Sequence, residues 1–360
     1  MFRLVYCSLI GLVVASSCFA AEWGMKTGNA DLKSAGPLAF GKNGILFVGD
    51  TKAASVVAID TGDRDGNANE VALHAHGIGK KIAKALGTSE VKINDLAVNP
   101  ATGTAYVSLS HGEQQAPGIV RMTGNGEITK LDTTKIDFSK VDLPNAPADE
   151  MVGKGRRRKN LRNESITDLA FSDGKVLVSG VVDGGKANVR ELVFPFHSAD
   201  KGINIEIYHG MHGRYETNAS VKTFVPFKIG GEPHLLAGFQ CTPLVKFPVK
   251  KFAESESVRG TTVAELGNWN RPLDMIVYEQ DGKDFVLLSN TARGVMKIST
   301  DNIERAEGIT SKVKDTGGQS YETIEGLKGV EQMDRLNDGH VLVIAKNEND
   351  SLDLHTVALP

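Results

Sequence analysis

The sequence predicts an all-β protein with the architecture of a β-propeller. A short phrase occurs twice, at residues 93–97 (Ile-Asn-Asp-Leu-Ala) and 166–170 (Ile-Thr-Asp-Leu-Ala), each time before a turn and an apolar run. Strand-like runs alternate with turn signals along the chain, and only residues 78–86 have a helical pattern. Weaker copies of the phrase lie at 36–40, 271–275 and 330–334. Self-similarity at this scale is typical of repeat architectures, and four-stranded units repeated radially form propellers.

The strand-like runs fall into six sets, which we interpret as six four-stranded blades, with seven blades as the alternative. Residues 22–26 are predicted to complete the sixth set, so that the N-terminal segment closes the ring. The six sets are 36–40, 44–49, 55–60 and 70–74; 94–98, 104–109, 118–122 and 127–131; 166–171, 175–181, 189–196 and 203–208; 221–227, 233–239, 243–248 and 261–265; 272–278, 284–289, 294–299 and 308–313; and 330–336, 340–345 and 352–358.

The N-terminus predicts a secretory signal peptide at residues 1–20, before a single propeller domain at 21–360. Arg3 precedes an apolar run at 4–14, and small residues follow where a signal peptidase cuts. This run is too short to span a bilayer, and no later stretch of the sequence qualifies. Lipidation of Cys18 is the alternative. We therefore expect a periplasmic or secreted protein without a transmembrane segment.

Charge and cysteine content argue against several classes of function. The formal net charge is −3, whereas general nucleic-acid binding needs a basic face. Without the signal peptide only Cys241 remains, so no internal disulfide can form, which fits a bacterial periplasm. The sequence has no Cys-x-x-Cys-His motif for c-type haem and no Walker, Gly-x-Ser-x-Gly or His-Glu-x-x-His motif.

The connections between the predicted strands differ between the two faces of the ring. Turns that join the first to the second and the third to the fourth strand of a blade are short, as at 172–174 and 280–282. Turns that join the second to the third strand lie on the opposite face, together with the crossings between blades. These connections are longer, include the crossing loops 75–92 and 132–165, and hold most of the polar side chains of interest. We call this side the elaborated face and expect function there.

Acidic residues at or near the starts of the innermost strands predict an acidic mouth of the central channel. Carboxylates and neutral oxygens of this kind suit calcium, which takes six to eight oxygen ligands. The alternative is that each Asp bonds neighbouring backbone amides and fixes the blade turn. Arg271 and Arg293 are predicted either to bind an anionic ligand or to pair with nearby acids. The predicted ligand-binding residues are Asn94, Asp95, Asp168, Glu216, Asn268, Asn270, Arg271, Asp274, Asn290 and Arg293.

His209 and His212 are the strongest candidates for a transition-metal site, with Glu216 four residues further on. Two imidazoles at this spacing in a glycine-flanked turn can converge on zinc or copper. The alternative is a pair of exposed loop histidines that bond the backbone. The predicted cofactor is therefore a divalent metal ion, either calcium at the channel mouth or zinc or copper here.

Three other segments have less specific interpretations. Cys241 is predicted to be a buried, inert thiol rather than a nucleophile, because nothing near it matches a cysteine-hydrolase signature. Residues 63–70 resemble a calcium loop, but the glycine is misplaced and the final Glu is missing, so we predict a solvated turn. The basic run 154–159 is predicted to be a solvated loop; the alternatives are that it binds an acidic partner or an anionic ligand, or that it lies over the acidic channel mouth.

Blade phrases such as 46–50 (Leu-Phe-Val-Gly-Asp) followed by 55–60 (Ser-Val-Val-Ala-Ile-Asp) resemble those of exported bacterial β-propellers over residues 34–358. The nearest enzymatic resemblance is to the six-bladed, calcium-dependent gluconolactonase and paraoxonase group, at the level of fold only. That resemblance implies a calcium ion held by Glu, Asn and Asp from several blades, and no catalytic role is carried over to a residue here.

Two functions follow as hypotheses. The first is a propeller that binds a small ligand, a metal ion or a protein partner on its elaborated face. The alternative is a metal-dependent enzyme at the channel mouth, either a lactone or ester hydrolase or an oxidoreductase that uses a cofactor. The sequence leaves open whether the protein is an enzyme.

Overall fold

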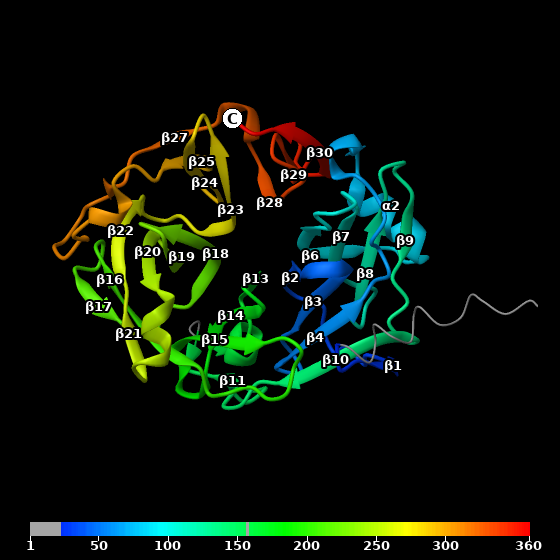
Figure 1. Ribbon diagram of the computed structural model, residues 1–360, viewed down its shortest axis with the longest axis horizontal. Coiled ribbons are helices and arrows are strands. Elements are labelled where there is room, and N and C mark those ends of the chain that lie inside the picture. Colours follow the sequence, from blue (N-terminus) through cyan, green and yellow to red (C-terminus); the bar gives the residue numbers. More distant parts are fainter. Residues whose placement is uncertain (1–22, 156–157) are drawn as a thin grey trace, which may run out of the picture.

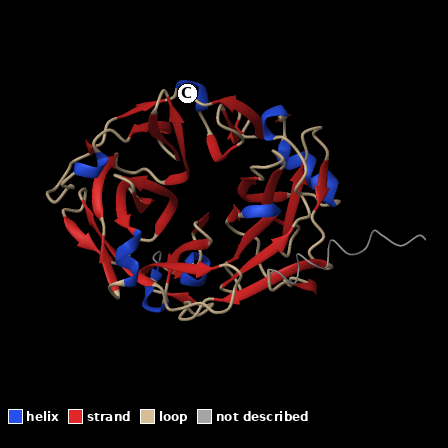
Figure 2. Ribbon diagram, in the orientation of Figure 1, coloured by secondary structure: helices blue, strands red, loops and turns tan. Residues whose placement is uncertain are grey.

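A computed structural model describes residues 23–155 and 158–360 of the chain. Over these residues, small antiparallel sheets are arranged as six blades around a central channel, so the predicted six-bladed β-propeller is confirmed (Figures 1 and 2). The described residues include one α-helix, α2 (Ile78–Leu86). The predicted signal peptide 1–20 and its Cys18 lie outside the described residues.

We number the blades by the order in which their innermost strands occur in the chain. Blade 1 contains β2 (Leu38–Phe40), β3 (Ile45–Asp50), β4 (Ser55–Asp60), β10 (Ile136–Asp142) and β1 (Lys26–Gly28). Blade 2 contains β6 (Val91–Val98), β7 (Ala105–His111), β8 (Ala116–Met122) and β9 (Ile128–Lys130). Blade 3 contains β13 (Asp168–Ser172), β14 (Lys175–Val181), β15 (Ala187–Val193), β16 (Ile203–His209), β17 (Arg214–Glu216) and β21 (Ser257–Arg259).

The remaining blades follow the chain. Blade 4 contains β18 (Val221–Ile229), β19 (Glu232–Phe239), β20 (Pro243–Pro248), β22 (Thr261–Leu266) and β26 (Thr316–Gly318). Blade 5 contains β23 (Pro272–Gln280), β24 (Lys283–Asn290), β25 (Gly294–Ser299) and β27 (Tyr321–Thr323). Blade 6 contains β28 (Val330–Arg335), β29 (His340–Lys346), β30 (Leu352–Ala358) and β5 (His74–Ala75).

The blades do not follow one another around the ring in chain order. The innermost strand β2 of blade 1 contacts both β6 of blade 2 and β13 of blade 3, and β6 also contacts β28 of blade 6. Blade 1 therefore lies between blades 2 and 3, and blade 2 lies next to the C-terminal blade 6 (Figure 1). The chain reaches this arrangement because it leaves blade 1 after three strands, builds blade 2, and returns with β10, which pairs with β4.

The predicted closing strand is wrong. Residues 26–28 form β1, which pairs with β10 on the outside of blade 1, and blade 6 is completed instead by β5, through the pairs Leu354↔Ala75 and His355↔His74. The prediction that 70–74 supplies the fourth strand of blade 1 is wrong for the same reason. Two interactions explain the outcome: Leu73 and Ala75 pack into the apolar cluster shared by blades 2 and 6, and β10 offers β4 a five-residue register.

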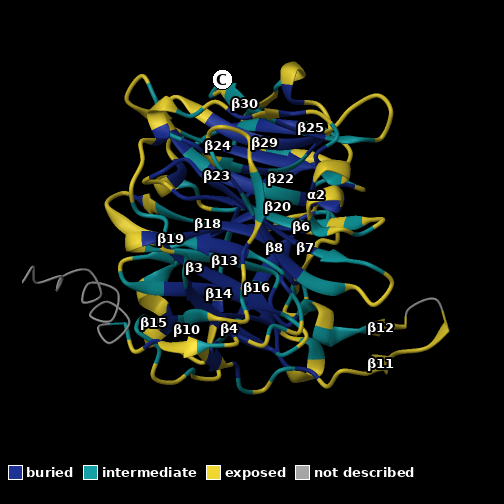
Figure 3. Cartoon of the chain, turned by 90° about the vertical axis from the view of Figure 1, so that its right-hand side faces the viewer, coloured by how far each residue is buried: buried dark blue, intermediate teal, exposed yellow. Residues whose placement is uncertain are grey.

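The apolar core is divided among the interfaces between blades. Alternate residues of each strand point to opposite faces of its sheet, so a blade contributes to the cluster on each side. One cluster joins Leu236 and Leu244 of blade 4 to Val286, Leu288 and Met296 of blade 5. The strands are accordingly buried while the connecting loops are exposed (Figure 3). This rigid ring supports the loops of the elaborated face.

Both predicted crossing loops contain regular structure. Residues 75–92 hold part of β5 and α2, and residues 132–165 hold β10 and the small sheet formed by β11 (Met151–Val152) and β12 (Lys159–Asn160). This hairpin extends away from the ring (Figure 3). Arg156 and Arg157 of the basic run lie outside the described residues. Among the described residues, no helix is long and apolar enough to cross a membrane.

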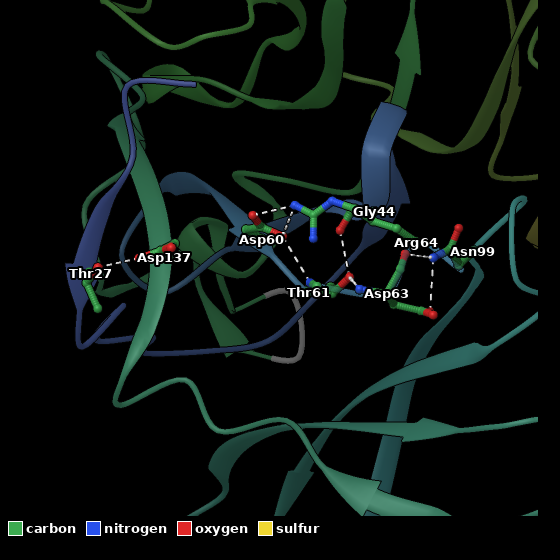
Figure 4. A network of polar contacts seen from close by, with 9 residues as sticks. Thr27, Gly44, Asp60, Thr61, Asp63, Arg64, Asn99 and Asp137 are labelled. Atoms are coloured by element: carbon green, nitrogen blue, oxygen red, sulfur yellow. Dashed lines mark hydrogen bonds and ion pairs between the residues drawn. The ribbon is translucent and has the colours of Figure 1, made fainter. Parts of the chain in front are cut away.

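Much of the segment 63–70 is exposed, as the sequence predicts, but its first residue, Asp63, is held by side chains of blade 2. Asp63 accepts hydrogen bonds through Oδ2 from Asn99 Nδ2 (3.0 Å), Thr102 Oγ1 (2.9 Å) and Tyr106 OH (3.2 Å). Its carbonyl accepts a further bond from Asn99 Nδ2 (2.7 Å; Figure 4). The loop therefore ties blade 1 to blade 2, and we call Asp63 with these three partners the Asp63 network.

Candidate functional site

The central channel contains a cavity of about 790 Å³. Its walls come from the innermost strands, four of which each contribute a carboxylate (Asp95, Asp168, Asp274 and Asp334), and Asp338 lines it from a turn. Further lining residues belong to the short turns, among them Pro100, Ala101 and Asn337. The cavity therefore extends toward the face opposite the elaborated one.

Each channel carboxylate joins two blades through backbone hydrogen bonds. Oδ1 accepts a bond from the next amide of its own strand, as Asp168 does from Leu169 (2.8 Å). Oδ2 accepts a bond from the innermost strand of the adjacent blade: Leu38 N for Asp95, Phe224 N for Asp168, Met333 N for Asp274 and Val98 N for Asp334, at 2.6–2.7 Å. An innermost strand has no ladder partner on its channel side, so these amides need another acceptor. The contacts favour the structural interpretation of the channel acids over a calcium site.

Burial raises the pKa of all four channel carboxyls. The pKa of Asp168 rises to about 7 and that of Asp334 to about 6, while the pKa values of Asp95 and Asp274 rise well above the usual range, with neighbouring channel carboxylates adding to the effect of burial. Asp334 was not among the predicted site residues. Asp334 is the fifth residue of its phrase (330–334), whereas Asp95 and Asp168 are the third residues of theirs, so the alignment of the phrases does not point to it.

A second cluster of ionisable groups lies on the elaborated face, at the outer edge of blades 3 and 4. β16 ends at His209, and a tight turn leads into β17, closed by Gly213 N, which donates to the carbonyls of His209 and Gly210. Gly213 has a φ of +65°, a left-handed conformation that favours glycine. The turn brings His212 back over His209, with the ring centroids 4.0 Å apart.

Glu216 connects the two imidazoles. Its Oε2 lies 3.0 Å from His209 Nδ1, and its Oε1 lies 2.7 Å from His212 Nδ1. Arg214 Nε also donates to Oε1, at 3.1 Å. One potential ligand atom from each of His209, His212 and Glu216 lies within 4.8 Å of the others. The structure thus brings together the three residues for which the sequence predicts a transition-metal site.

Blade 4 adds a carboxylate that the sequence analysis missed. Glu265, on β22, is 1% exposed, and its Oε1 accepts a hydrogen bond from Gly210 N (2.5 Å). A Cβ at position 210 would lie 2.8 Å from Oε1, so any larger residue there would require the Glu265 side chain to move. The signal in the sequence is a lone acid among the apolar residues Val263, Ala264 and Leu266. We call His209, His212, Glu216 and Glu265 the His/Glu cluster.

Two buried atoms of the His/Glu cluster have no hydrogen-bond partner among the described residues, namely His209 Nε2 and Glu265 Oε2. Burial lowers the pKa of His209, although Glu216 opposes this. Burial raises the pKa of Glu265 to about 7, with Glu216 adding to the rise. Burial alone would raise the pKa of Glu216, but hydrogen bonds from His209, His212 and Arg214 lower it. Buried polar groups normally have partners, so these two orphaned atoms mark a candidate ligand site.

The other predicted ligand residues are not brought into a single site. Asn94 donates to the carbonyl of Ala35 at the edge of the channel. Asn268, Asn270, Arg271 and Arg293 lie in loops on the elaborated side of blades 4 and 5, and Asn290 is the last residue of β24 on the same side. Arg293 pairs with Asp315 (2.8 Å), so of the two predicted alternatives its contacts favour pairing with an acid. Asn270 and Asn290 accept backbone bonds from Ala292 and Arg293, while their Nδ2 atoms are buried and without a partner in the described chain.

The comparisons with known proteins give no family. No family model and no curated protein matches this chain. Solved structures that resemble it include a streptogramin B lyase (10% identity, 94% of this chain and 99% of that one, TM-score 0.34). Another is a putative oxidoreductase (glucose dehydrogenase) from Thermus thermophilus (13% identity, 93% and 100%, TM-score 0.31), and a third is a chain of the mitotic checkpoint complex (9% identity, 100% and 99%, TM-score 0.38). At these TM-scores the matches carry no argument about function. The resemblance to the lactonase group stays a prediction.

Proposed function

We propose that the protein is a metal-binding β-propeller that holds a divalent transition-metal ion, zinc by preference, at the His/Glu cluster of its elaborated face. The observation that carries the proposal is the convergence of His209, His212 and Glu216, whose ligand atoms lie within 4.8 Å of one another.

The chemistry of the donor set favours zinc. Two imidazoles and a carboxylate are a common protein ligand set for zinc, with bonds of about 2.0–2.2 Å. Calcium, in contrast, prefers six to eight oxygens. Glu265 lies next to this set, because its Oε1 accepts a bond from Gly210 N, and a bound cation would favour the ionised form of its buried, unpartnered carboxyl. Copper(II) binds such sites more tightly than zinc, so the two metals have to be compared directly.

The alternative, an enzyme at the channel mouth, stays a prediction. The channel carboxylates already accept two backbone hydrogen bonds each, which favours a role in joining blades. A periplasmic or secreted location and a small-molecule or protein partner likewise stay predictions.

The test is elemental analysis of the mature protein, purified without chelator and without a histidine tag, combined with thermal unfolding before and after EDTA. We expect close to one zinc ion per chain and a lower melting temperature after chelation, because a ligand that binds only the folded state stabilises it. His209→Ala should abolish both effects. The matched control is His340→Ala on the opposite face, which should retain the metal.

A protein without bound metal that takes up neither zinc nor copper in titration would overturn the proposal. The same holds if metal binds equally well to wild type and His209→Ala, because the site would then lie elsewhere.

A further inference from the structure

The loop between β22 and β23 presents Trp269 to solvent on the elaborated face. The side chain is 89% exposed, the largest value among the exposed large hydrophobic residues of the described chain. Because the Trp269 side chain is not buried, it adds no hydrophobic stabilisation to the fold, and it exposes a large apolar surface to water. Its presence therefore needs an explanation other than the stability of the fold.

The loop that carries Trp269 is firmly attached to the body of the protein. Beneath it, Asn270 is fully buried, its carbonyl accepts a bond from Cys241 N (2.8 Å), and its Oδ1 accepts one from Ala292 N (3.0 Å). Thr242 Oγ1 donates to the carbonyl of Gly267 (2.7 Å), and Asn268 N donates to Asp315 Oδ1 (3.1 Å). Trp269 is thus held in place before any partner arrives, which reduces the entropy lost on binding.

The backbone at Trp269 is strained. Its φ is +56°, a left-handed conformation that is uncommon for any residue other than glycine and an outlier for a bulky one. A glycine or asparagine would adopt this conformation at a lower cost. Strain of this kind persists where the surroundings enforce it and is concentrated at functional sites.

Unpaired cations lie next to this loop. Asn268 Nδ2 donates to the carbonyl of Lys314, and Val313 N donates to the carbonyl of Gly210, so residues 312–315 connect the Trp269 loop with the His/Glu cluster. Lys312, Lys314 and Arg271 are exposed and have no ion-pair partner within residues 23–155 and 158–360. The nearby Asp315 is already paired with Arg293. An aromatic anchor therefore stands among free positive charges.

We propose that Trp269, with Arg271, Lys312 and Lys314, is a docking surface for an acidic polypeptide segment of a partner protein. Tryptophan and arginine are the residues that most often carry binding energy at protein interfaces, particularly where one aromatic anchor enters a pocket of the partner. The surrounding lysines select carboxylates on that partner and accelerate its association. This surface is independent of the proposed metal site, because none of its four side chains belongs to the His/Glu cluster.

The test uses a random peptide library displayed on phage, selected on the wild-type protein with its metal content left as purified. We expect enrichment of peptides rich in Asp and Glu that also carry apolar residues, and dissociation constants in the micromolar range or below. In a Trp23→Phe background Trp269 is the single tryptophan, so binding of a selected synthetic peptide should shift its fluorescence to the blue and protect it from acrylamide.

Trp269→Gly should weaken binding of the selected peptides at least tenfold without lowering the melting temperature, because glycine relieves the backbone. The double variant Lys312→Glu/Lys314→Glu should reverse the salt dependence of peptide binding. When the salt concentration is lowered, the wild type should bind the acidic peptide more tightly and the double variant more weakly, because screening of the charges decreases. The matched control, Val193→Ala with Lys228→Glu, changes an exposed apolar residue and an exposed cation away from this loop and should bind as wild type.

Enriched peptides without acidic bias, or peptides that bind Trp269→Gly as tightly as wild type, would overturn the proposal. A second result would also overturn it. If Trp269→Gly weakened binding to vesicles of anionic phospholipid, or to dextran sulfate, as much as it weakened binding to the peptides, the surface would recognise negative charge alone and not a polypeptide.

Discussion

The Asp63 network and the His/Glu cluster are both largely buried groups of polar side chains that join two blades, yet they differ in how their atoms are used. Three side-chain donors surround a single oxygen of Asp63, and all three belong to buried residues. In the His/Glu cluster, acids and imidazoles converge, and His209 Nε2 and Glu265 Oε2 have no partner in the described chain. A carboxylate enclosed by the protein's own donors fixes structure, whereas acceptors that converge with atoms left over are arranged for a ligand.

The same distinction separates the channel acids from the His/Glu cluster. The four channel carboxyls have raised pKa values, but every one accepts bonds from two backbone amides. A perturbed pKa in a cavity is therefore weak evidence for function when each oxygen is already engaged. In this protein, buried polar atoms without a hydrogen-bond partner, rather than a high density of charge, identify the His/Glu cluster as the stronger candidate site.

The largest effect on stability is expected from Asp63→Ala. Removal of the carboxylate takes this acceptor from Thr102 Oγ1 and Tyr106 OH, while Asn99 Nδ2 keeps the backbone carbonyl of residue 63. The free energy of unfolding should therefore fall by about 3 kcal/mol. Urea denaturation measures this loss, and Asp65→Ala in the exposed part of the same loop is the control. An unchanged midpoint for Asp63→Ala would mean that the network is not structural, and the contrast with the His/Glu cluster would fail.

His212→Ala should show the opposite behaviour. His212 is half-exposed, so its loss should change the stability of the metal-free protein by less than about 1 kcal/mol. Loss of one of three ligands should nevertheless weaken zinc binding about 100-fold, equivalent to about 2.7 kcal/mol. Competitive titration with a chromophoric chelator measures the affinity. A variant that loses stability but keeps its zinc affinity would assign the cluster a structural role.

Glu265→Gln should stabilise the metal-free protein at high pH. The pKa of Glu265 is raised to about 7, so the folded protein retains a proton that the unfolded chain has released. Wild-type stability should then fall as the pH rises from about 5 to about 7.5, because over this interval the folded state binds more protons. Gln cannot ionise and can still accept from Gly210, so the variant should be more stable by roughly 2 kcal/mol at pH 8 and nearly equal at pH 5.

Chemical denaturation in EDTA across this pH range measures the difference. Asp168 and Asp334 contribute the same sign of pH dependence, but they are present in both proteins and cancel in the comparison. A zinc titration of the same variant is informative, because a gain in stability together with a loss of zinc affinity is the behaviour of a functional residue. Parallel pH curves would show that Glu265 does not carry the buried proton.

Much of this architecture could be predicted from the sequence, because each blade repeats its strand and turn signals locally. The spacing of His209, His212 and Glu216 is also local and was sufficient to nominate the cluster. The position of blade 2 between blades 1 and 6 depends on which strand pairs with β4, a competition between segments far apart in the chain. Glu265 could not be linked to His209 for the same reason: 55 residues separate it from Gly210, and only the fold brings them together.

The smallest effect is expected from Cys241→Gly, at the turn that supports the Trp269 loop. Cys241 and Thr242 have φ values of +62° and +61°, a left-handed conformation that favours glycine. Glycine at 241 should relieve part of this strain and raise the free energy of unfolding by about 0.5 kcal/mol, and the bond from Thr242 to Gly267 remains. Zinc affinity should not change, since Cys241 is outside the His/Glu cluster. The control is Cys241→Ser, which keeps the left-handed backbone strain. A loss of zinc in either variant would mean that the thiol of Cys241 is part of the metal site, and the His/Glu cluster would then not be separate from the turn that supports the Trp269 loop.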